Sequence, residues 1–87
     1  MLNVLYSKNF AKSLKKKDKF IKEKARKRIR LFREDPFNVL LNNHALSGEF
    51  ENKRSFDVTG DYRILFYYAD KNTVVFSDIG THSELYE

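Results

Sequence analysis

The chain contains two histidines, His44 and His82, and imidazole is the side chain that most readily exchanges protons near neutral pH. Asp57 and Asp61 are further acid–base candidates. RNA cleavage without a metal needs a group that removes the proton of the attacking 2′-hydroxyl, a group that protonates the leaving 5′-oxygen, and a cation that holds the phosphate. His44 and His82 are therefore candidates for the two proton transfers of such a reaction.

Cations and aromatic side chains of the right type surround these candidates in the sequence. Lys53, Arg54 and Arg63 could hold a phosphate, the arginines by a two-pronged contact. Tyr86 could stack on an unpaired base. The arginines could instead form structural ion pairs with the two carboxylates, and both interpretations stay open at this point.

Other kinds of site are poorly supported by the sequence. The chain has no cysteine, which excludes disulfides, thiolate metal ligands and a cysteine nucleophile. Two widely separated histidines with scattered acids do not have the spacing of a metal site. With only three glycines, no glycine-rich phosphate loop is present. We therefore expect no metal and no small-molecule cofactor.

The positive charge is concentrated in one segment. Residues 8–33 contain 13 Lys or Arg and two acids, whereas the remaining residues contain four bases and ten acids. A solvated helix face is the plain alternative, but two acids cannot neutralise this segment by ion pairing. The asymmetry predicts a polyanionic partner or an acidic protein partner.

The elements that must position these residues follow from the hydrophobic pattern. Residues 2–6 alternate as a short strand, and Ser7 or Asn9 can cap a first helix. Asp18 can cap a second helix, which ends at Asp35-Pro36. Apolar residues recur at helical spacing along one face of this second helix: Ile21, Ala25, Ile29 and Phe32. Three strands are expected at residues 53–58, 62–68 and 73–79.

The predicted order is therefore β-α-α-β-β-β, in a single α+β domain over residues 1–87. A two-helix hairpin should bury its apolar stripe against one face of a mainly antiparallel four-stranded sheet. The opposite face is then free as a working surface. Between the helices and the first of these three strands, Leu40, Leu41 and Leu46 could anchor an irregular segment to the core.

No apolar run approaches the length of a membrane span, and the N-terminus does not have the pattern of a signal peptide. We therefore expect no membrane association and a cytoplasmic location.

Several short motifs, taken in order, resemble one protein family. They are Tyr6-Ser7, the run Asn-His-Ala-Leu-Ser-Gly at residues 43–48, Lys53-Arg54, the run Asp-Tyr-Arg-Ile-Leu-Phe at residues 61–66, and the ending Gly-Thr-His-Ser-Glu-Leu-Tyr at residues 80–86. The chain resembles, over nearly its whole length, the RelE/ParE superfamily of type II toxins, and most closely its YafQ-like branch.

The resemblance implies a RelE-like fold and a ribosome-dependent mRNA endonuclease that acts by metal-independent 2′-hydroxyl attack. It implies an acidic antitoxin, mRNA and 16S rRNA as partners. By position, His44 and His82 match the branch's loop and tail histidines, Asp61 its catalytic aspartate, and Tyr86 its terminal aromatic residue. Arg63 matches a phosphate-gripping arginine of RelE-type members.

Two residues depart from the pattern of the branch. Asp57 stands where the branch usually has a third histidine, and it can donate a proton at neutral pH only if burial or a second carboxylate raises its pKa. Tyr62 stands where the branch has Trp, and it can still stack on a base. Two alternatives remain, a ParE-like inhibitor of DNA gyrase and a non-catalytic RNA-binding relative. The ending His82-x-x-Leu85-Tyr86 argues against the first.

Overall fold

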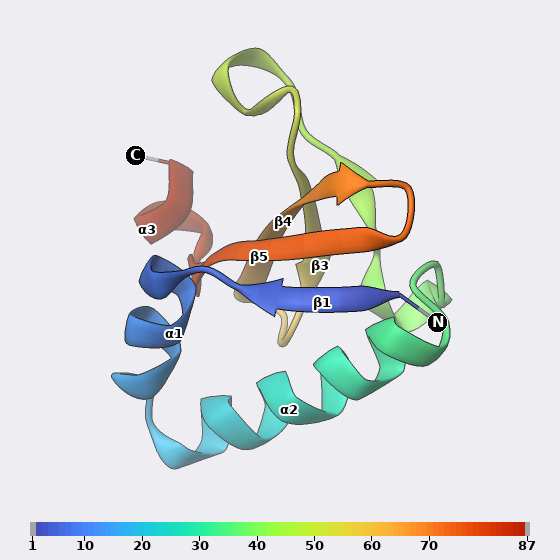
Figure 1. Ribbon diagram of the computed structural model, residues 1–87. Helices are drawn as coiled ribbons and strands as arrows, with labels where there is room; N and C mark the ends of the chain where they lie inside the picture. The colour runs from blue at the N-terminus through green and yellow to red at the C-terminus, as the bar shows by residue number, and fades with distance from the viewer. Residues whose placement is uncertain (1, 87) are drawn as a thin grey trace.

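The computed structural model describes residues 2–86, in which two helices cover one face of a five-stranded sheet (Figure 1). The strands are β1 (Asn3–Tyr6), β2 (His44–Ala45), β3 (Arg54–Asp57), β4 (Tyr62–Asp70) and β5 (Thr73–Thr81). The α-helices are α1 (Lys8–Lys15), α2 (Lys19–Glu34) and α3 (His82–Tyr86), and single 3-10 turns occur at Val39–Leu41 and Gly48–Phe50.

The sheet has the strand order β1-β5-β4-β3-β2, with β1 parallel to β5 and the other pairs antiparallel. The predicted α+β class and element order are confirmed. The strand count is corrected from four to five, because His44 and Ala45 pair with Ser55 and Arg54 to form β2. Two residues are too few to show the alternation by which a strand is recognised in a sequence.

Both long helices begin at short polar side chains, as the sequence predicts. The Ser7 hydroxyl accepts a hydrogen bond from the Phe10 backbone N–H at 3.0 Å, so Ser7 rather than Asn9 caps α1. The Asp18 carboxylate accepts from the Ile21 N–H at 2.9 Å and caps α2. These contacts satisfy backbone donors that the first helical turn leaves without partners.

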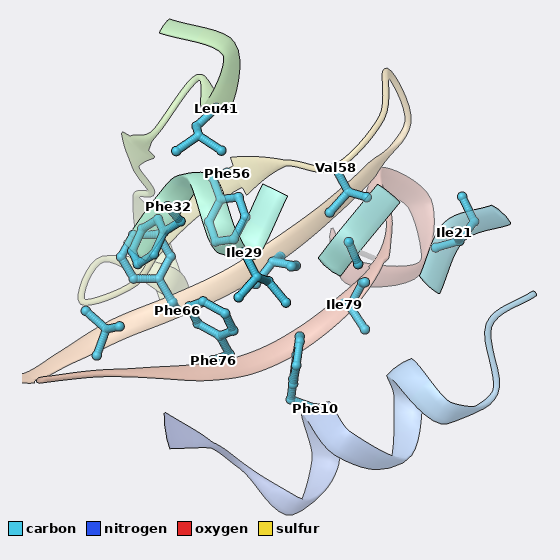
Figure 2. Close-up of a cluster of buried hydrophobic side chains, with 13 residues drawn as sticks. Phe10, Ile21, Ile29, Phe32, Leu41, Phe56, Val58, Phe66, Phe76 and Ile79 are labelled. Carbon is cyan, nitrogen blue, oxygen red and sulfur yellow. The ribbon is translucent and has the colours of Figure 1, made fainter. Parts of the chain in front are cut away.

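The core lies between α2 and the inner face of the sheet (Figure 2). The Phe32 ring stacks on Phe56 at 4.8 Å and meets Phe66 edge-on at 4.9 Å. All four members of the predicted apolar stripe of α2 are buried: Ile21, Ala25, Ile29 and Phe32. The apolar stripe therefore fixes which side of this cationic helix faces the sheet.

The segment after α2 is anchored by fewer leucines than the sequence suggests. Leu41 is fully buried, whereas Leu40 is 62% exposed, so the expectation that Leu40 anchors the core is wrong. The 3-10 turn at Val39–Leu41 directs only its last side chain inward. Arg28 on α2 holds this turn by donating a hydrogen bond to the Leu40 carbonyl at 2.6 Å.

The outer face of the sheet carries no long helix. Figure 1 shows α2 on one side of the sheet, and α3 with the loop of residues 46–53 on the other. Within residues 2–86, no helix is long and apolar enough to cross a membrane. The outer face is therefore bordered by two short segments, which leave a hollow between them.

Replacing Phe32 with Ala should destabilise the fold strongly, because the change removes a fully buried ring from the centre of the core. We expect a loss of about 3–5 kcal/mol in the free energy of unfolding, measured by urea denaturation. Phe20→Ala on the same helix is the matched control, because Phe20 is 62% exposed, and it should cost about 0.5 kcal/mol or less. Equal losses in the two variants would contradict this account of the core.

Candidate active site

A cavity of about 260 Å³ opens on the outer face of the sheet. Its walls come from β2, β4, α3 and the loop of residues 46–53. The residues that line it are His44, Leu46, Ser47, Phe50, Arg63, His82 and Tyr86. Both histidines, one arginine and the terminal aromatic residue singled out in the sequence thus lie around one space, although they come from separate elements.

Arg63 reaches the cavity because of its register in β4. It lies opposite Asp57 on β3 and opposite Gly80 on β5, while the next residue, Ile64, points into the core. The Arg63 Nε atom is 3.8 Å from the Asp57 Oδ1 atom, and each side chain is about one quarter exposed. For Arg63 the ion-pair alternative is therefore realised, and its partner is Asp57. Since the carboxylate faces Nε, the terminal nitrogens of the guanidinium stay available to another anion.

His44 is held through one of its two ring nitrogens. Its Nδ1 atom lies 2.7 Å from the backbone carbonyl oxygen of Asn42. A carbonyl only accepts hydrogen bonds, so Nδ1 carries the hydrogen and the neutral ring presents a free lone pair on Nε2. Asn42 has a left-handed backbone with φ of 49°, and its side-chain amide donates to Asp57 Oδ2 at 3.4 Å. Asp57 thus links the loop that carries His44 to the strand that carries Arg63.

His82 and Tyr86 occupy the two ends of α3. Residues four apart lie on the same face of a helix, and the two ring centroids are 4.7 Å apart. The Tyr86 ring also meets the Phe50 ring edge-on at 5.6 Å. The Tyr86 hydroxyl is buried and has no hydrogen-bond partner within residues 2–86. The end of the described chain is therefore packed against the loop of residues 46–53.

Two predicted cations lie away from this cavity. Lys53 and Arg54 line a separate hollow with Tyr67 and Tyr68. The Arg54 side chain points to the helix-covered side, where its Nε donates to Asn43 Oδ1 at 2.9 Å. These two residues are therefore not placed to act on a group bound between the histidines.

Two further predicted residues also lie outside the cavity. Tyr62 shares the inner face of β4 with Ile64, packs against the core, and has the Lys17 ammonium 5.7 Å from its ring centroid. Asp61 is exposed in the turn between β3 and β4, and it does not line the cavity. The alternation of side chains along β4 separates Tyr62 from Arg63, because neighbouring residues of a strand face opposite sides.

The sequence interpretation missed the contributions of Phe50 and Asn42. Phe50 supports Tyr86 from a loop whose other side chains are mostly polar, and an isolated aromatic residue in such a loop was the available signal. Asn42 had no signal, because it acts through its backbone carbonyl on His44 and through a side-chain contact with Asp57, which is distant in the sequence. Within residues 2–86, no three His, Cys, Asp or Glu side chains gather closely enough to hold a metal ion.

The arrangement combines the groups needed to move two protons about a held anion. One imidazole has its orientation fixed by a carbonyl, a second stands at the start of a helix, and a guanidinium lies at the same cavity. An aromatic ring beside them offers a flat surface for a base. This set of groups fits a phosphodiester of a single-stranded nucleic acid.

Solved structures share this fold over their whole length. A crystal structure of YafQ from E. coli BL21(DE3) covers 100% of both chains at 20% identity, with a TM-score of 0.80. YafQ in an E. coli DinJ–YafQ complex covers 99% of this chain and 98% of that chain at 22% identity, with a TM-score of 0.77. A metal-bound toxin from Helicobacter pylori covers 99% and 100% at 27% identity, with a TM-score of 0.71.

A comparison with curated protein sequences gives no significant match. The family model for the bacterial toxin YafQ of type II toxin–antitoxin systems matches residues 2–87. The chain therefore belongs to the YafQ family of type II toxins.

Proposed function

We propose that this toxin is an endoribonuclease that cuts mRNA on the ribosome by metal-independent attack of a 2′-hydroxyl on the adjacent phosphate. The observation that carries the proposal is that His44, Arg63 and His82 line one cavity on the side of the sheet that α2 leaves open. Membership of a toxin family supports a harmful activity of this kind.

In this mechanism His44 is the general base. Its Nδ1 hydrogen is engaged by the Asn42 carbonyl at 2.7 Å, so Nε2 is the nitrogen that can take the proton of the 2′-hydroxyl. The hydroxyl oxygen then attacks phosphorus, and the new O2′–P bond forms. The carbonyl also stabilises the imidazolium that results, because Nδ1–H remains its donor.

His82 is the general acid in the same step. As the P–O5′ bond breaks, the protonated imidazole gives its proton to the leaving 5′-oxygen. The products are a 2′,3′-cyclic phosphate and a free 5′-hydroxyl, so the protons and the phosphate charge balance. Arg63 holds the phosphate oxygens as charge builds, and Tyr86 stacks on a neighbouring base.

Asp57 acts on the site through its neighbours in this scheme. Its carboxylate faces the Arg63 Nε atom and accepts from the Asn42 amide, so it orients both the guanidinium and the loop before His44. We therefore propose that Asp57 is a positioning residue rather than a proton donor. Asp61, which is exposed in its turn, has no step in the scheme.

The helices supply the proposed partner surfaces. Residues 8–33 contain 13 Lys or Arg. Each phosphate that they neutralise adds about −0.7 to −0.9 to the slope of the logarithm of the RNA-binding constant against the logarithm of the salt concentration. The proposed polyanion is the ribosome, with its 16S rRNA and bound mRNA, which sets the activity in the cytoplasm. An acidic antitoxin is the proposed protein partner, and the DinJ–YafQ complex supports such a pairing.

Replacing His82 with Ala should reduce cleavage of a translated message by about 10²–10⁴-fold, because the leaving oxygen loses its acid. The fold should survive, since His82 is exposed. Cut sites mapped by primer extension on translating ribosomes measure the loss, and Ser83→Ala on the same helix is the control. Undiminished cleavage would remove His82 from the mechanism.

Inhibition of gyrase in a supercoiling assay, with the message intact, would favour the ParE-like alternative.

Asp57→Asn separates the positioning role from proton transfer. Arg63 and Asn42 face different oxygens of the carboxylate, so the single amide oxygen of Asn can keep one of the two contacts. We therefore expect cleavage to fall by about tenfold or less, whereas Asp57→Ala loses both contacts and should lose about 10²-fold. Single-turnover cleavage rates on programmed ribosomes measure both variants. A loss in Asp57→Asn as large as in His82→Ala would instead make Asp57 a proton donor or acceptor.

A further inference from the structure

The last strand passes directly into the helix that carries two residues of the cavity, His82 and Tyr86. β5 ends at Thr81, and α3 begins at His82 without an intervening turn. α3 has five residues, none of them buried. A helix this short is unstable by itself in water, because nucleation costs more than its few hydrogen bonds return. Specific contacts must therefore hold α3 in place.

A reciprocal pair of hydrogen bonds closes the start of α3. The Glu84 Oε1 atom accepts from the Thr81 backbone N–H at 2.8 Å, and the Thr81 hydroxyl accepts from the Glu84 N–H at 3.2 Å. This is a capping box, with Thr81 as the N-cap and Glu84 three residues later. Hydrogen bonds from the Thr81 backbone and side chain, and then the charge of Lys17, lower the pKa of Glu84. The carboxylate is thus ionised at neutral pH.

Gly80 gives this cap the space it needs. Gly80 is buried, and a Cβ atom at this position would lie 3.3 Å from Glu84 Oε1 and 3.3 Å from Leu85 Cδ2. Those contacts are tighter than ordinary van der Waals packing. The missing side chain therefore lets α3 fold back closely on the end of β5.

The cap also controls the catalytic geometry. His82 is the first residue of α3 and Tyr86 the last, and their rings are 4.7 Å apart on one helix face. Any fraying or rotation of α3 moves both rings relative to Arg63, which is fixed on β4. We propose that Thr81 and Glu84 are positioning residues, whose reciprocal cap sets where the His82 and Tyr86 rings stand in the cavity.

Matched pairs of variants test the cap without touching the cavity. Glu84→Ala and Thr81→Val remove one hydrogen bond each, whereas Glu84→Gln and Thr81→Ser keep an acceptor at the same place. Ser83→Ala is the control for an alanine within α3. All five variants should melt close to the wild type, because none of the substituted side chains is buried.

The first readout is structural and independent of RNA. In NMR spectra, the cross-peaks between the His82 and Tyr86 rings should be lost in Glu84→Ala and Thr81→Val. So should the slow exchange of the backbone amide that each change leaves without its acceptor, which is the Thr81 amide in Glu84→Ala and the Glu84 amide in Thr81→Val. Both signals should persist in the Gln, Ser and control variants. Persistence of the signals in Glu84→Ala and Thr81→Val would overturn the proposal.

The second readout rests on the proposed function. The rate of message cleavage at saturating toxin should fall by about 10- to 100-fold in Glu84→Ala and Thr81→Val, because misplacement by about 1 Å is that costly. Glu84→Gln and Thr81→Ser should stay within about threefold of wild type. Equal losses in the conservative pair would overturn the positioning role. If the wild type cleaves no RNA, the proposed function fails, while the NMR comparison still decides whether the cap holds α3.

Discussion

The rest of the structure depends on the contact between Phe32 of α2 and the aromatic residues on the inner face of the sheet. α2 is cationic on most of its surface, and burying an unpaired charge is costly. Its apolar stripe is therefore the part of the helix that can pack against the sheet. Because this stripe packs against it, one face of the sheet becomes part of the core. The other face is then left to short segments, and a cavity can form there without any loss of core packing.

The two walls of the cavity are held in different ways. Arg63 and His44 belong to the sheet, and Asp57 joins them through an ion pair and the Asn42 amide. His82 and Tyr86 belong to a one-turn helix whose order comes from local hydrogen bonds. At position 57 this chain has a carboxylate that contacts both Arg63 and Asn42.

The sequence predicts the parts of this fold that depend on local periodicity. The stripe of α2 repeats at helical spacing, and Asp18 caps that helix, so both are recognisable. β2 and α3 are not, because two residues show no alternation and five residues are too few to show a helical repeat. That His44 and His82 line one cavity depends on how β2 and α3 are placed about the sheet, which is a non-local arrangement. The support of Tyr86 by Phe50 is a non-local contact, which no spacing along the chain encodes.

The positively charged helices and the candidate cavity lie on different sides of a molecule that measures 32 × 29 × 26 Å. The cationic helices are on the inner side of the sheet (Figure 1). The residues that line the cavity are on the outer side. One short stretch of RNA in the cavity cannot also span that thickness to neutralise the helices. In the proposed function, RNA contacts both surfaces at once when the protein sits in an enclosure with RNA on opposite sides. The layout thus fits the proposal that this toxin acts on a message held inside a ribosomal site.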